Sequence, residues 1–315
     1  MCYYAVRIAG VALLLFTICF GNVAQTPSAA INHYKDGLSK TNKGDLDGAI
    51  RDYTRAIELS SRLFSGDSRS KWGNGTDADV ESARITVVDP FTARAYSNRG
   101  VVRYRKGDFE GAIRDFNQAV RIKPSLAEAY MNRGAAKRIQ GDREGALEDA
   151  NRAISLDNKL YEAYNNRGAL RFDLGDLDGA LSDLNRAIEL NSGVFEQFYH
   201  RGYVHIRRRD YGKAISDFDR AIQLNPSVAQ AYQGRGTARM SKGEYDSAIA
   251  DFNRALELND SLPFSYMNRG LAFMMKRLDA EAQRDFEKCL ALDSELASEI
   301  KSRKEMAEEL RKARP

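Results

Sequence analysis

Histidine is well suited to hold a transition-metal ion, and this 315-residue chain contains three: His33, His200 and His205. A helical zinc pair needs two histidines at positions i and i+4, where they point to the same side of the helix. His200 and His205 are five residues apart, and His33 is distant from both in sequence. The histidines therefore predict no metal site.

Two short strings resemble the start of a calcium-binding loop. GDLDG occurs at 44–48 and again at 175–179. A calcium loop also needs a glutamate six residues after its glycine, but Thr54 and Asn185 stand there. The sequence also lacks a phosphate-binding loop, a dinucleotide fingerprint and a nucleophile elbow. We therefore expect a protein that is not an enzyme and uses no metal or cofactor.

A repeating motif organises the rest of the chain. AYSNRG at 95–100 returns in similar forms, and the glycines that close these motifs are 34 residues apart: Gly100, Gly134, Gly168, Gly202, Gly236 and Gly270. A fixed period of this length indicates an array of helical hairpins that stack on one another. Over residues 30–296 the unit resembles the tetratricopeptide repeat, a helix–turn–helix module.

The resemblance implies an all-α fold, a right-handed α-solenoid of about seven helical hairpins. Its segments would be a divergent first repeat at 30–63 and an inserted loop at 64–92. Six regular repeats would follow at 93–296, and a C-terminal capping helix at 297–315. A loop of this length is usually functional or disordered, so both a flexible loop and a partner-contacting flap remain open. In the capping helix we expect Ile300, Ala307 and Leu310 to cover the last hairpin.

Two positions of the repeat carry opposite charges. If the closing glycine is the eighth position, the seventh is arginine in six repeats and the twenty-third is aspartate in all seven. In an antiparallel hairpin that turns near position fifteen these two positions face each other, so we expect an Arg–Asp pair inside each repeat. A stripe that binds nucleic-acid phosphates is the alternative, because position eleven is often basic as well.

Single departures from the repeat predict local differences. Arg209 and Arg277 replace the turn glycine of the other repeats, and we expect those two turns to be strained, since glycine suits a left-handed residue after a helix. Ala150 stands where other repeats have an aromatic residue or leucine, so the third repeat should be less well filled. Cys289 stands where the others have alanine, which indicates a small buried residue.

The N-terminus resembles a secretory signal peptide over residues 1–24. Its apolar run, Ile8–Phe20, follows a single charge at Arg7 and is too short for a comfortable membrane span. We therefore expect a periplasmic or secreted bacterial protein with no membrane span in the mature chain. The alternatives are that the segment is retained as a membrane anchor or that Cys19 is lipidated.

The charge balance argues against a dedicated nucleic-acid binder. The chain has 48 basic and 44 acidic residues, a net charge of +4, whereas nucleic-acid binding relies on a strong basic excess. The related pentatricopeptide repeats, which read RNA, have a 35-residue period and a strongly basic groove. Here the period is 34 residues, and Arg94, Arg138 and Arg207 are mixed with Glu128 and Glu162.

The resemblance places repeat positions two, five, nine, twelve and thirteen in a concave groove. The residues at these groove positions vary between repeats, while the positions that define the hairpin, such as the closing glycine, do not. This suggests a non-repeating ligand such as a peptide or partner helix. The expected partner site lies in the later repeats, at Tyr199, Tyr203, Arg207, Met240, Phe264, Met267, Leu271, Met274 and Met275. The alternatives are unconstrained surface, coverage by residues 297–313, or a homodimer formed through this patch.

These features predict a non-catalytic protein–protein interaction scaffold of the bacterial cell envelope, which binds a peptide or protein in its groove. A structural spacer in an envelope assembly is the alternative.

Overall fold

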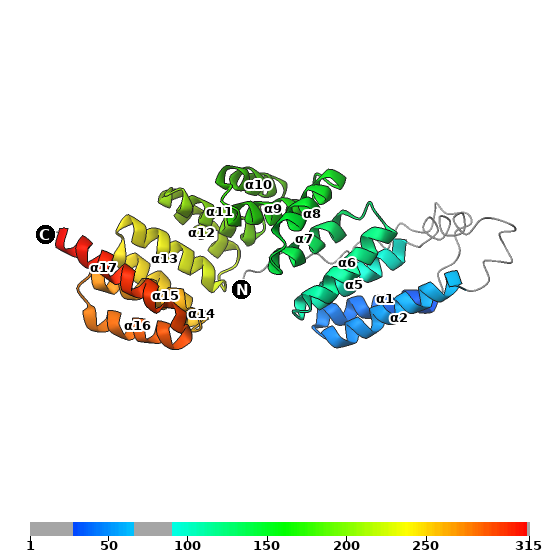
Figure 1. Ribbon diagram of the computed structural model, residues 1–315, viewed down its shortest axis with the longest axis horizontal. Coiled ribbons are helices and arrows are strands. Elements are labelled where there is room, and N and C mark those ends of the chain that lie inside the picture. The colour runs from blue at the N-terminus through cyan, green and yellow to red at the C-terminus, as the bar shows by residue number, and fades with distance from the viewer. Residues whose placement is uncertain (1–27, 66–89, 314–315) are drawn as a thin grey trace. The chain divides into compact units, whose positions relative to one another are not determined.

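Figure 1 shows the computed structural model of this chain, which describes residues 28–65 and 90–313. In these ranges the regular structure is helical, as expected for an all-α fold. The early helices are α1 (Ser28–Lys43), α2 (Leu46–Ser65), α5 (Pro90–Arg105), α6 (Phe109–Ile122), α7 (Ala127–Ile139), α8 (Arg143–Leu156) and α9 (Tyr161–Asp173). The later ones are α10 (Leu177–Leu190), α11 (Phe195–Arg207), α12 (Tyr211–Leu224), α13 (Ala229–Lys242), α14 (Tyr245–Leu258), α15 (Pro263–Met275), α16 (Asp279–Leu292), the 3₁₀ turn η1 (Ser294–Leu296) and α17 (Ala297–Ala313).

The chain divides into two compact units, and the boundary falls within α9, between Leu170 and Arg171. The first unit contains α1 to α8 and the second contains α10 to α17. The expected signal peptide, residues 1–24, lies outside the described residues, as do residues 66–89 of the expected inserted loop. Both segments therefore stay predictions.

Four of the seven hairpin turns are built from a glycine and the aspartate that follows it. Gly107 has φ of 82°, a left-handed conformation that reverses the chain after α5. The Asp108 carboxylate then accepts a hydrogen bond of 2.9 Å from the Gly111 backbone N–H and caps α6. The turns at Gly141 and Gly175 repeat this arrangement.

The two turns without glycine are the strained ones. Arg209 has φ of 63° and Arg277 has φ of 62°, and they are the non-glycine residues with positive φ in the described part of the chain. The left-handed region costs a residue with a Cβ about 1–2 kcal/mol. The expectation from the sequence is therefore confirmed.

Close contact between the two helices of a repeat explains the closing glycine. A Cβ on Gly236 would lie 2.8 Å from the ring of Phe252, so a larger residue would push the helices apart. In the third repeat Ala150 stands in place of this ring, and a small void remains between Gly134, Ala150 and Met131. The third repeat is therefore less well filled, as expected.

The capping helix α17 packs against the last hairpin through one face. Leu296, Ile300 and Ala307 are buried in a cluster with α15 and α16 residues, among them Phe286 and Cys289. Leu310 does not join them: it is 50% exposed, so its expected role in covering the hairpin was wrong. The packed face of the helix runs through Ile300, Lys304 and Ala307, and Leu310 lies beside it, toward solvent.

Candidate functional site

The arginines at position seven form a ladder of contacts within each unit. Arg235 is typical: its Nη2 lies 2.6 Å from Asp251 Oδ1 and its Nε 3.0 Å from Oδ2. The same paired geometry holds for Arg99, Arg133, Arg201 and Arg269 with the aspartates 16 residues later. These pairs are the structural ones expected from the sequence.

Each arginine has a second partner that was not predicted from the sequence. The Nη1 of Arg235 donates to Asp219 of the preceding repeat at 2.6 Å. Position twenty-five supplies the same kind of acceptor elsewhere, at Thr54, Asn117, Asn151, Asn185 and Asn253. Because this position is polar in every repeat, its side chains were a readable signal. Each guanidinium therefore joins two neighbouring repeats, and these donors are used inside the array.

Position eleven adds a second cation to the same aspartate. Arg103, Lys137 and Arg239 lie 2.8–2.9 Å from the aspartate of their own repeat. His205 replaces this cation in the fifth repeat, and its Nε2 is 3.7 Å from Asp217. Burial lowers the pKa of His205, although the nearby Asp217 carboxylate acts in the opposite direction. The fifth repeat is thus the one whose second cation depends on pH.

Three of the expected partner-binding residues, Tyr199, Tyr203 and Arg207, lie on α11 in the fifth repeat, and we call them the fifth-repeat group. The rings of Tyr199 and Tyr203 meet edge to face with centroids 5.0 Å apart, and Tyr203 packs on Phe218 at 5.2 Å. Both tyrosines are half-buried. The guanidinium of Arg207 is exposed and stacks on Phe172 at 5.5 Å. This fifth-repeat group therefore offers ring surface and a cation at groove positions.

The other expected residues lie around α15 and are largely covered. Met267, Leu271 and Met274 are only 0%, 7% and 4% exposed, and they share a cluster with Ile300 and Ala307 of α17. Met240 and Met275 are half-buried against the same cluster, and Phe264 is exposed. Of the alternatives left open by the sequence, coverage by residues 297–313 is the arrangement that the structure shows. Met267, Leu271 and Met274 are core residues in this arrangement, so an open methionine surface was the wrong expectation.

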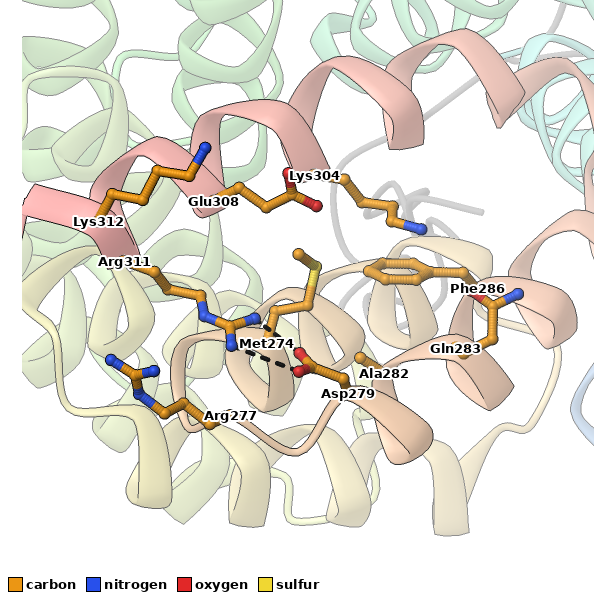
Figure 2. A pocket seen from close by; sticks show the side chains of 10 residues that line it. All are labelled: Met274, Arg277, Asp279, Ala282, Gln283, Phe286, Lys304, Glu308, Arg311 and Lys312. Carbon is orange, nitrogen blue, oxygen red and sulfur yellow. Dashed lines mark hydrogen bonds and ion pairs between the residues drawn. The ribbon is translucent and has the colours of Figure 1, made fainter.

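A cleft of about 600 Å³ opens between α17 and the last hairpin (Figure 2). Met274, Ala282 and Phe286 lie at its base and are buried, while Arg277, Lys304, Arg311 and Lys312 supply positive charge along its sides. Arg311 makes two hydrogen bonds to Asp279, of 2.6 and 3.3 Å. We call this site the C-terminal cleft. The C-terminal cleft could not be predicted from the sequence, because it depends on where α17 lies.

Among residues 28–65 and 90–313, no group of histidine, cysteine, aspartate or glutamate side chains is arranged to hold a metal ion. In the same ranges none of the helices is both long enough and apolar enough to span a membrane.

Family models match much of the chain. Models described as tetratricopeptide repeat or TPR repeat match residues 100–138, 127–160, 161–193, 199–263 and 234–293. No curated protein matches the chain significantly.

Solved structures share the fold at low sequence identity. A tetratricopeptide repeat protein from Parabacteroides merdae is 19% identical with a TM-score of 0.60, over 89% of this chain and 99% of that one. The APC/C hetero-tetramer Cut9–Hcn1 gives 16% identity and a TM-score of 0.63, over 87% of this chain and 76% of that one. A MamA protein is 30% identical with a TM-score of 0.45, over 54% of this chain and 92% of that one. With its 34-residue hairpins and the family models that match residues 100–193 and 199–293, the chain belongs to the tetratricopeptide repeat family.

Proposed function

We propose that this protein is a non-catalytic interaction scaffold that binds a peptide or protein partner along the groove positions of its C-terminal unit. The observation that carries the proposal is the fifth-repeat group, in which Tyr199, Tyr203 and Arg207 are at least partly accessible at positions five, nine and thirteen. Tyrosine and arginine are the residue types that most often anchor a protein interface.

The distribution of polar contacts supports this assignment. The ladder arginines use their donors on aspartates and on position-twenty-five acceptors, so they hold the repeats together rather than face a ligand. Exposed groove positions instead differ from repeat to repeat: position thirteen is Arg105, Ile139, Asp173 and Arg207 in successive repeats. A fixed frame with a varying surface suits a partner whose own sequence does not repeat.

The partner surface includes side chains near the covered methionines that remain accessible. Phe264 is exposed, and Met240 and Met275 are half-buried. Methionine adapts to irregular surfaces, so these residues extend the proposed surface beyond the fifth repeat. Met267, Leu271 and Met274 would join it only if α17 moved away.

The cellular location of the protein is proposed from the sequence alone. The signal-like residues 1–24 favour export to the bacterial cell envelope, where the chain would act as an adaptor. A structural spacer and a homodimer are the competing proposals, and the experiment below separates the homodimer from the adaptor.

The test is chemical cross-linking of the purified protein in a cell-envelope extract, followed by mass spectrometry. Arg207→Glu and Phe264→Glu both change exposed groove side chains and should abolish the same cross-linked species while helical circular dichroism is unchanged. Arg284→Glu is the matched control, because Arg284 is an exposed α16 residue whose contacts among the described residues, with Ala280 and Glu281, lie within its own helix. If both groove variants keep every cross-linked species, the groove is not the partner site. Loss of a self-cross-link alone would favour the homodimer.

A further inference from the structure

We propose that the fifth-repeat group and Glu196 together bind an extended peptide segment that has a basic side chain at one end, an acidic side chain at the other and apolar residues between them. This inference rests on the proposed function, and it names the chemistry of the partner at the same site. Three observations carry it: a carboxylate without a compensating cation, an arginine held in place without a carboxylate partner, and the aromatic surface between them.

Four groove residues form one stripe along α11. In the order i, i+3, i+7 and i+11 they are Glu196, Tyr199, Tyr203 and Arg207. This spacing keeps the four side chains on one face of the helix. Both tyrosines are half-buried and their rings meet edge to face, so the middle of the stripe is ring surface. Among the groove positions of α11, α13 and α15, only those of Glu196 and Arg207 are charged. The stripe therefore has one negative and one positive end.

The Glu196 carboxylate has no cation to compensate its charge. Its side chain is half-buried, and this burial raises the pKa of Glu196. No lysine, arginine or histidine of the described residues forms an ion pair with it. A carboxylate that is partly removed from water without a partner is unfavourable, and a cation beside it recovers part of that energy. This end of the stripe therefore suits a lysine or arginine side chain of the partner.

Arg207 is positioned to receive the opposite charge. Its guanidinium stacks on the ring of Phe172, 5.5 Å from the centroid. Stacking uses a flat face of the guanidinium and leaves the N–H groups along its edge available, and this edge matches a carboxylate. The ladder residue Arg201 already bonds to Asp217 at 2.7 Å, whereas Arg207 makes no ion pair with any residue of 28–65 or 90–313. This end of the stripe therefore suits an aspartate or glutamate of the partner.

The length of the stripe and its neighbouring helix favour an extended partner. With a rise of 1.5 Å per residue, the backbones at Glu196 and Arg207 are about 16 Å apart along the helix. An extended chain advances roughly 3.1–3.4 Å per residue, so charged residues about five positions apart match the two ends. On α13, which contacts α11, the side-chain amides of Gln230 and Gln233 form no hydrogen bond with another described residue. They can bond the backbone of an extended chain, whereas a helical segment has already paired those groups internally.

The experiment is isothermal titration calorimetry of the full chain with peptides whose termini are blocked, so that only the side chains carry charge. The reference peptide is Lys-Pro-Leu-Pro-Leu-Asp. Three further peptides replace its lysine by glutamine, its aspartate by asparagine, or both leucines by glycine. We expect the wild-type chain to bind the reference peptide, and each of the three replacements to weaken binding by about tenfold.

Variants of the protein assign each charge of the peptide to one end of the stripe. Glu196→Gln should weaken binding of the reference peptide about tenfold but leave binding of the peptide that lacks lysine unchanged. Arg207→Gln should show the same dependence on the aspartate of the peptide. A general disturbance of the fold would weaken all peptides alike, so this pairing identifies direct contacts. Glu257→Gln is the matched control, because Glu257 is an exposed α14 residue that pairs with Arg254 at 2.9 Å, and it should change no affinity.

The results that overturn this inference differ from those that overturn the proposed function. Equal binding of the charged and neutral-ended peptides would leave a peptide groove but reject the charge assignment, as would variants that weaken all peptides alike or none. If no peptide binds while Arg207→Glu and Phe264→Glu still abolish a cross-linked species, the groove holds a partner of other chemistry. Paired losses in calorimetry with unchanged cross-links would support the peptide chemistry and show that the partner in the extract binds elsewhere.

Discussion

Removing one arginine of the ladder tests whether these residues hold the repeats together. In Arg235→Ala the carboxylate of Asp251, only 4% exposed, loses its two-bond partner, and Asp219 of the preceding repeat loses its contact as well. The ring of Tyr232 also loses the guanidinium that stacks on it at 5.5 Å. The variant therefore weakens its own repeat and the junction with the repeat before it.

The expected loss of stability in Arg235→Ala follows from the burial of the Asp251 carboxylate. Breaking a buried ion pair by removing one partner costs about 3–5 kcal/mol. Arg239 remains 2.8 Å from Asp251 and still neutralises part of its charge, so we expect the low end, about 3 kcal/mol. With an m-value of about 3 kcal/mol per molar urea, this corresponds to a fall in the midpoint of about 1 M.

Urea unfolding followed by circular dichroism measures this difference. Arg284→Ala is the control: its side chain is 71% exposed and pairs with Glu281 on the surface, so its cost should stay under about 1 kcal/mol. Asp219→Ala removes only the contact between repeats, so its urea midpoint should lie between those of Arg235→Ala and Arg284→Ala. If Arg235→Ala and Arg284→Ala unfold at the same urea concentration, the ladder does not stabilise the array and the reasoning fails.

Four further predictions follow from particular residues. Ala150→Leu should fill the void beside Gly134 and raise the urea midpoint, by about 1 kcal/mol of stability; a lower midpoint would show that the site is already closed. Burial lowers the pKa of His205 in the folded state. The neutral imidazole of His205 should therefore contribute fully to folding stability above pH about 6.5, the pKa in the unfolded chain, and this contribution should be lost as the pH falls through the pKa in the folded protein. The groups facing it are Asp217, Asp210, Arg201 and Lys213, so urea midpoints from pH 5 to 8 should rise for the wild type and rise less for His205→Gln. Cys289 is buried and burial raises its pKa, so a thiol reagent should modify it only after urea is added, and rapid modification of the native protein would contradict the packing around α17. The mature chain should begin between residues 22 and 30, and N-terminal sequencing of exported protein that finds Met1 would reject the signal-peptide interpretation.

Regular parts of the array could be read from the sequence because each repeat has nearly the same surroundings as the next. The 34-residue period, the Arg–Asp pairs and the strained turns at Arg209 and Arg277 each follow from one hairpin repeated along the chain. A single hairpin also suffices to predict the void at Ala150. These features depend on contacts within a repeat, where sequence spacing determines which side chains meet.

Contacts between repeats and at the end of the array required the tertiary structure. Position twenty-five is polar in every repeat, but which side chain it meets, as Asp219 meets Arg235, depends on the rotation between neighbouring hairpins, which the sequence does not specify. Within the described residues α16 is followed by α17 and not by another repeat, so the packing of α17 itself decided that Ile300 and Ala307 lie inward and Leu310 outward. That placement buried Met267 and opened the C-terminal cleft, because side chains of α17 had to meet a surface shaped for another repeat.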